Sequence, residues 1–133
     1  MDDVVIIGGG IIGTATAYFL SKEGRKVKVI ERDPTYKTAS FPLSLGGFRR
    51  QFFQKENILL GKFARDFIFK IPEVLKTEKN PNPTASMVTN GYLLMFGPEH
   101  AEEQYRALEN HKECDAGTKN IKGSELSNVF PYI

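Results

Sequence analysis

The stretch VVIIGGGIIG, residues 4–13, decides the fold of this 133-residue chain. Its first four residues form a β-branched run that ends in glycines, which is typical of a buried parallel strand. Gly8, Gly10 and Gly13 have the spacing G-x-G-x-x-G, a weak signal alone but a stronger one between a strand and a helix. The sequence therefore predicts an α/β fold that begins with a strand, a tight glycine turn and a helix.

Each glycine of this motif has its own physical task. Gly8 allows the tight turn, Gly10 lets a pyrophosphate approach the backbone, and Gly13 lets the helix lie close to the strand. The start of the helix presents unpaired N–H groups and about half a positive charge, which attract a diphosphate. A glycine-rich turn without a ligand is the alternative.

The residues that follow supply the rest of a dinucleotide-binding pattern. Gly24 is placed to end the helix, and residues 26–30 are expected to form a second strand. Glu31 closes that strand 18 residues after Gly13, where a carboxylate can accept hydrogen bonds from ribose hydroxyls. A carboxylate would repel a 2′-phosphate, which disfavours NADP and leaves FAD and NAD open. A solvated acid at a strand end is the alternative interpretation of Glu31.

The chain after the second strand does not continue as an NAD-binding domain would. Such a domain adds another helix and a third parallel strand. Residues 37–48 are instead small and turn-forming and show no sustained period. This composition fits a loop that brings backbone N–H groups and hydroxyls close to a flat ligand, although an ordinary surface loop has the same composition. An NAD-binding dehydrogenase domain is thus the weaker alternative.

Taken together, these motifs resemble the D-amino-acid-oxidase-like FAD-dependent oxidoreductases, a family that includes glycine oxidase, sarcosine oxidase and dimethylglycine dehydrogenase. Residues 91–96 resemble the family's strand that leads into the substrate domain, and residues 124–126 and 130–133 resemble its acidic-Leu and Pro-x-Ile segments. Within the family, the most similar branch is mitochondrial and linked to assembly of respiratory complex I. The stretches that carry this closer similarity are residues 31–36, 43–47, 51–52, 56–58 and 91–94.

The resemblance implies roles for the matching positions. A first group would cradle the FAD pyrophosphate, namely Gly8, Gly10, Ile11, Ile12 and Gly13. Glu31 would hold the adenosine ribose, Arg32 would lie beside the adenine, and Ser40 would approach the pyrophosphate and ribityl chain. A last group would lie against the isoalloxazine ring, namely Ser44, Leu45, Gly46 and Gly47.

Two further expectations concern the flavin and the substrate. Some relatives attach the flavin through a histidine in this region, but the chain has no His between residues 32 and 99, so FAD is expected to bind non-covalently. Some amine-oxidising relatives place an arginine near Arg49 and Arg50 to bind a substrate carboxylate, a task that suits the bidentate guanidinium. The register between the two is open, and a solvated basic pair is the alternative.

The resemblance also implies a domain plan and two functions. Residues 1–80 would be the Rossmann-type FAD-binding part, and residues 81–133 the start of a substrate-binding α+β domain. The function would be oxidation of an amine or amino-acid-like substrate by hydride transfer to FAD. The alternative is a mitochondrial assembly factor that docks on complex I intermediates with little or no turnover. The catalytic residues are expected beyond Ile133, so we expect the chain to be the N-terminal part of a longer protein.

The remaining periodicity predicts three more elements. Apolar residues recur at helical spacing over residues 59–71, and Pro72 ends or kinks that helix. Residues 77–86 read as a loop and residues 91–96 as a strand. A last helix begins at Pro98, with Ala101, Tyr105 and Leu108 expected to face inward.

Composition excludes several classes of protein. With 41% hydrophobic and 26% charged residues, the chain is ordinary for a globular domain and unlike a disordered, collagenous or coiled-coil sequence. The net charge of +2 is too small to indicate a nucleic-acid partner. No apolar run approaches the roughly 20 residues that a spanning helix needs. His100 and His111 lie too far apart to share a metal and are expected at the surface, and Cys114 is expected to have no catalytic role.

Overall fold

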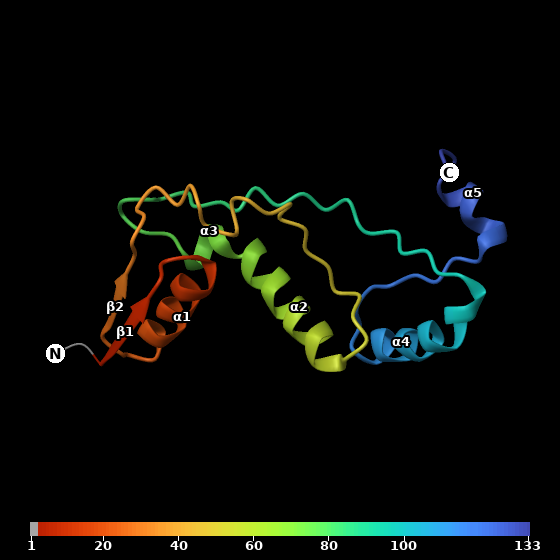
Figure 1. Cartoon of the computed structure of the whole chain (residues 1–133), viewed down its shortest axis with the longest axis horizontal. Coiled ribbons are helices and arrows are strands. Elements are labelled where there is room, and N and C mark those ends of the chain that lie inside the picture. The colour runs from red at the N-terminus through yellow and green to blue at the C-terminus, as the bar shows by residue number, and fades with distance from the viewer. Residues whose placement is uncertain (1–2) are drawn as a thin grey trace. The chain divides into compact units, whose positions relative to one another are not determined.

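The computed structural model describes residues 3–133, which divide after Gly47 into two compact units (Figure 1). The first unit contains β1 (Val4–Ile7), α1 (Ile11–Lys22) and β2 (Val27–Ile30). The second unit is helical among the described residues. Its elements are α2 (Lys55–Phe69), α3 (Ile71–Val74), the 3-10 helix η1 (Pro98–His100), α4 (Ala101–Glu113), the 3-10 helix η2 (Gly123–Glu125) and α5 (Leu126–Val129).

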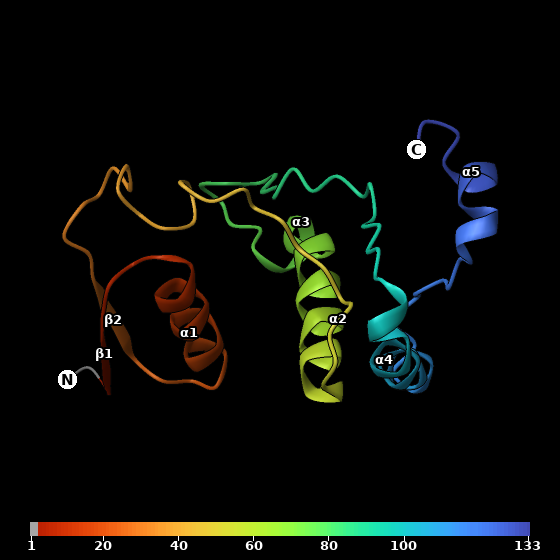
Figure 2. The same cartoon turned by 45° about the vertical axis from the view of Figure 1, so that its right-hand side comes forward.

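The first unit is a β-α-β fold, as the sequence predicts. β1 and β2 pair in parallel with Val4 opposite Val27 and Ile7 opposite Ile30. α1 lies alongside this pair in both views (Figure 1, Figure 2). Side chains alternate across β1: Val4 and Ile6 are half-buried, whereas Ile7 remains 88% exposed. Gly24 follows α1 with φ of +79°, which confirms its predicted place at the helix end.

α2 confirms the helix that the sequence predicts over residues 59–71, but its apolar stripe is not a buried core, because Leu59, Leu60 and Phe63 are each more than half exposed. The helix ends at Phe69, and α3 begins two residues later with Pro72 in its first turn. The break falls before Pro72 because proline has no N–H to continue the hydrogen bonds of a helix interior, whereas it is tolerated in the first turn of a new helix. Residues 77–86 contain no helix or strand, as predicted.

The core of the second unit is small. Ile58 is fully buried against Cys114 and Ala116, and Phe52 packs on this cluster. Polar contacts join the same segments: the Nε2–H of His111 donates to the Phe52 carbonyl at 2.9 Å, because a carbonyl oxygen can only accept. The Lys62 ammonium of α2 also donates to the carbonyl of Cys114, the residue after α4, at 2.6 Å. A few apolar residues and such hydrogen bonds therefore join α2 to the end of α4.

Replacing Ile58 by Ala should destabilise the second unit by about 2–4 kcal/mol, because a large side chain in a small core leaves a cavity that few neighbours can fill. Urea unfolding followed by circular dichroism measures this loss. Leu60 is 65% exposed on the same helix, so Leu60→Ala is the matched control and should cost little. Equal effects of the two substitutions would show that Ile58 is not the centre of this core.

Three expectations for the second unit are wrong. Residues 91–96 form no strand, because no other described strand pairs with them. Of the residues expected to face inward, Tyr105 is 62% exposed, Ala101 is exposed too and Leu108 is half-buried. Ala107 and His111 are buried instead. The expected surface position is therefore correct for His100 and wrong for His111, whose ring is held at the Phe52 carbonyl.

No described helix is both long and apolar enough to span a membrane.

The boundary between the compact units lies at residues 47–48, whereas the resemblance to the oxidase family places a functional boundary near residue 80. The compact units are defined by packing and the functional parts by their expected roles, so one functional part can contain more than one compact unit. The functional boundary at residue 80 stays a prediction.

Candidate dinucleotide site

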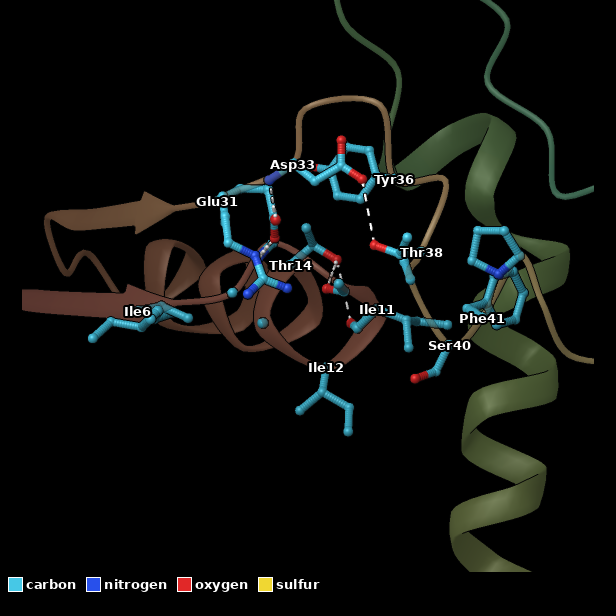
Figure 3. Close-up of a pocket in the computed structure, with 18 of the residues that line it drawn as sticks. Ile6, Ile11, Ile12, Thr14, Glu31, Asp33, Tyr36, Thr38, Ser40 and Phe41 are labelled. Carbon is cyan, nitrogen blue, oxygen red and sulfur yellow. Dashed lines mark hydrogen bonds between the residues drawn. The ribbon is translucent and has the colours of Figure 1, made fainter.

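An open pocket of about 730 Å³ lies in the first unit, at the ends of β1 and β2 (Figure 3). That volume is in the range of small-molecule sites. Parallel sheets bind ligands at this edge, beyond the carboxyl ends of their strands. The pocket brings together eight of the predicted cofactor-binding residues, namely Gly8, Gly10, Ile11, Ile12, Gly13, Glu31, Arg32 and Ser40.

The glycine turn has the geometry that the motif predicts. Gly8 has φ of +101°, a region that favours glycine, and its N–H donates to the Ile30 carbonyl at 2.8 Å. A Cβ added to Gly13 would stand 1.9 Å from the Gly8 carbonyl oxygen, so only glycine allows the helix to lie this close. A Cβ added to Gly10 would meet nothing within 4 Å. Gly10 is therefore open toward the pocket, as a backbone that receives a ligand must be.

The first turn of α1 is prepared for an anion. Gly10 precedes the helix in extended conformation, and no side chain caps the N–H groups of the first turn. The first turn also contains no acidic residue. The Thr14 hydroxyl donates backward to the Gly10 carbonyl at 2.9 Å, away from those N–H groups. The donors and the partial positive charge at this end can thus act on a diphosphate.

Glu31 is fixed by two backbone donors, one to each carboxylate oxygen. The Gly9 N–H donates to Oε2 at 2.5 Å and the Asp33 N–H donates to Oε1 at 2.7 Å. These two hydrogen bonds hold the pKa of Glu31 below its ordinary value of 4.5, and the bond from the Asp33 N–H has the larger effect. Each carboxylate oxygen has a second lone pair, so the group can still accept one hydroxyl on each oxygen. A ribose diol presents two such hydroxyls.

Replacing Glu31 by Ala should weaken FAD binding by roughly tenfold to a hundredfold, because hydrogen bonds to a charged group are worth more than neutral ones. The first unit should stay folded, because Glu31 is half-exposed and water can take the place of its removed carboxylate beside the two N–H donors. A flavin-fluorescence titration of the variant beside the parent chain measures the change. Equal affinities would remove Glu31 from the ribose site.

Flavin retention should also depend on pH in one direction. The pKa of Glu31 lies below 4.5 in the folded chain, so its carboxylate is charged at neutral pH and accepts hydrogen bonds. The contribution of this carboxylate is complete at a pH above the pKa that Glu31 has in the unfolded chain. It is lost as the pH falls through the lowered pKa of the folded chain. Flavin release followed by fluorescence should therefore be flat from neutral pH to about pH 5 and rise only below about pH 4.5. A rise centred near neutral pH would assign the titration to another group.

The remaining predicted site residues lie outside the pocket. Ser44, Leu45, Gly46 and Gly47 follow the lining residues in sequence but do not line the pocket, and Leu45 is fully exposed. The Ser44 hydroxyl donates to the Phe41 carbonyl at 2.8 Å, which closes a local turn. Their place against a flavin ring stays a prediction.

Arg49 and Arg50 belong to the second unit and differ in their surroundings. The Arg49 guanidinium lies over the Phe52 ring, 5.1 Å from its centre. A Cβ added to Gly117 would stand 3.1 Å from a guanidinium nitrogen of Arg50, so that side chain packs on the loop after α4. Arg49 is the more exposed of the two. Their predicted contact with a substrate carboxylate stays a prediction.

Sequence reasoning missed several residues that line the pocket. These are Ile6, Ile7, Gly9, Thr14, Thr16, Asp33, Tyr36, Thr38, Ala39, Phe41 and Pro42. Thr14 and Thr16 follow the motif on the first turns of α1, and their helical position was the available signal. No sequence signal was available for Tyr36, because its position depends on a left-handed turn that no residue pattern in the sequence predicts.

No group of His, Cys, Asp and Glu among residues 3–133 is arranged to hold a metal ion.

A strand–turn–helix with open N–H groups, facing a carboxylate at the end of the next strand, defines a dinucleotide-binding protein of the Rossmann type. The family model of the FAD dependent oxidoreductases of the DAO family matches residues 3–132. The chain therefore belongs to the DAO family of FAD-dependent oxidoreductases, and the resemblance drawn from its motifs is confirmed.

The chain is similar over 98% of its length to several curated proteins with one name, FAD-dependent oxidoreductase domain-containing protein 1. It is 40% identical to the protein of Xenopus laevis, 35% identical to that of Bos taurus and 33% identical to the Drosophila melanogaster homolog. The matches cover 27%, 28% and 25% of those proteins, so the chain spans about a quarter of their length. No solved structure matches the chain.

Proposed function

We propose that this chain forms the N-terminal nucleotide-binding part of an FAD-dependent oxidoreductase that oxidises an amine or amino-acid-like substrate. One observation carries the binding part of the proposal: the uncapped N-terminus of α1 and the Glu31 carboxylate face one pocket. Diphosphate and ribose are joined in a dinucleotide, and these two groups match them in charge and hydrogen bonding. Membership of the DAO family selects FAD among the dinucleotides.

The residues of the pocket would divide the cofactor between them. The N–H groups of the first turn of α1 would bind the diphosphate, with Gly10 leaving room for its approach. Glu31 would orient the adenosine ribose, and Arg32 would lie beside the adenine. Ser40 would donate its hydroxyl to the diphosphate or the ribityl chain. Bound flavin supplies the ring that accepts a hydride, while the protein supplies position and charge. Non-covalent attachment is supported by the absence of histidine from residues 32–99.

The substrate side is the further part of the proposal. Residues 81–133 would begin a substrate-binding domain, and Ser44–Gly47 would lie against the flavin ring. Arg49 is the better candidate for a substrate carboxylate, because its guanidinium is more exposed than that of Arg50, which packs by Gly117. A guanidinium binds a carboxylate through two parallel hydrogen bonds.

The test of the proposal is the visible absorption spectrum of the purified chain, recorded before and after denaturation. A flavin band that co-elutes with the protein and is released by denaturant supports non-covalent FAD. A folded, monodisperse chain that stays colourless with added FAD would contradict the proposal.

A mitochondrial assembly factor for respiratory complex I is the second candidate. Two observations support it. The motifs of this chain resemble those of the family branch described above. Large apolar side chains are also exposed on α2, where Leu59, Leu60 and Phe63 are each more than half exposed. Exposed apolar patches of this kind are typical of protein interfaces. Flavin reduction by a panel of amines separates the two functions when it is measured on the whole protein, because the catalytic residues are expected beyond Ile133. Intact FAD binding without reduction by any amine favours the assembly factor.

A further inference from the structure

Tyr36 stands out because its backbone is in a conformation that aromatic residues rarely adopt. Its φ is +55°, in the left-handed region that favours glycine and asparagine. Such conformations persist only where the surrounding structure fixes them, and they gather at binding sites. Tyr36 lines the pocket and belongs to the loop that leaves β2, together with Asp33 and Thr38 (Figure 3).

The loop around Tyr36 is fixed by hydrogen bonds on both sides. The Tyr36 N–H donates to the Asp33 carbonyl, and the Tyr36 carbonyl accepts from the Ala39 N–H, each at 3.1 Å. The Asp33 carboxylate accepts from both the N–H and the hydroxyl of Thr35, at 2.9 and 2.6 Å. These bonds maintain the left-handed turn, and the Tyr36 hydroxyl then lies at the glycine turn that follows β1.

The Tyr36 hydroxyl lies directly against Gly9. A Cβ added to Gly9 would stand 3.0 Å from that hydroxyl, 3.2 Å from the Glu31 Cβ and 3.3 Å from Glu31 Oε2. Gly9 is buried, and its N–H is one of the two donors to the Glu31 carboxylate. Tyr36 and Glu31 thus meet at the same face of Gly9, where a side chain would otherwise lie. The dinucleotide motif leaves this position free to vary, but in this chain an added methyl group would be in tight contact with both Tyr36 and Glu31.

We propose that Tyr36 is a positioning residue for Glu31, which it holds on the Gly9 N–H in the orientation that receives the adenosine ribose. The Tyr36 hydroxyl lies beside this buried glycine, where it limits the space into which the Glu31 side chain can move. The carboxylate then keeps one fixed orientation, with the second lone pair of each oxygen available to a ribose hydroxyl. This inference rests on the proposed function, because the ribose belongs to the FAD that the pocket is proposed to bind.

Two variants of the full chain test the contact. Gly9→Ala places a methyl group against the Tyr36 hydroxyl and should lower FAD affinity about tenfold by displacing Glu31. Tyr36→Phe removes the hydroxyl and leaves the ring. The added methyl group would still stand 3.2 Å from the Glu31 Cβ, so the double variant should recover part, not all, of the affinity that Gly9→Ala loses. Equal affinities for the Gly9→Ala chain and its double variant would overturn the proposal.

A third variant separates positioning from folding. Asparagine accommodates the left-handed turn but has no hydroxyl to place beside Gly9, so Tyr36→Asn should keep the melting temperature and lower FAD affinity. FMN contains no adenosine ribose, so any affinity for FMN should be the same in the parent chain and in Tyr36→Asn. Loss of FAD and FMN affinity together, or no loss of either, would overturn the role of Tyr36. A parent chain that binds no FAD would contradict the proposed function itself, which distinguishes the two failures.

Discussion

Gly10→Val is expected to abolish FAD binding while the chain stays folded. A side chain at Gly10 meets no protein atom within 4 Å, so the substitution creates no clash inside the first unit. Gly10 also has φ of −65°, which any residue can adopt. The same open space is where a diphosphate would approach the N–H groups of α1, and an isopropyl group would occupy it. The variant should therefore carry no flavin after gel filtration and show an unchanged circular dichroism spectrum.

A matched control is available in the second unit. Gly123 also has nothing within 4 Å of an added Cβ, and it is exposed. Gly123→Val should keep the flavin content of the parent chain. If Gly10→Val retained its flavin as well, the diphosphate would have to bind elsewhere, and the assignment of the pocket would be wrong.

Gly13→Ala is expected to unfold the first unit. The added methyl group would stand 1.9 Å from the Gly8 carbonyl oxygen, an atom of the backbone that cannot rotate away. Overpacking of this kind costs about 3 kcal/mol or more. The first unit has two strands and one helix, and units of this size have little stability to lose. Hydrogen exchange of the amides in β1, α1 and β2 should show loss of protection, together with loss of flavin.

Gly10→Ala is the control for this prediction, because it adds the same methyl group three residues earlier in open space. It should leave amide protection unchanged. The two glycines of one motif would then be separated by experiment into one required for packing and one required for the ligand. Full protection in Gly13→Ala would mean that α1 can move away from the strand without loss.

The first unit was predictable from sequence because its constraints are local. The β-branched run, the three glycines and the acid at the end of the next strand each fix a short segment, and the observed β1, α1 and β2 follow them closely. Eight of the predicted cofactor-binding residues line the pocket for the same reason. The Tyr36 contact could not be predicted, because it depends on a turn built from hydrogen bonds among residues 33–39.

The second unit was harder to predict because its contacts lie far apart in sequence. The stripe over residues 59–71 identified α2, but which face of α4 is buried depends on where that helix meets residues 52–58. Tyr105 was therefore placed inward and His111 outward, the reverse of what is observed. Residues 91–96 have strand-like composition, but a strand forms only where another pairs with it.

The burial of Cys114 gives the second unit a reporter of its own. The thiol is the only one in the sequence and belongs to the cluster around Ile58, so a bulky maleimide can reach it only when α4 separates from α2. Its labelling rate in the native chain therefore measures how often this junction opens, with no engineered probe. Urea and Ile58→Ala should both raise that rate, and labelling as fast as that of a free thiol peptide would mean that the junction is open most of the time.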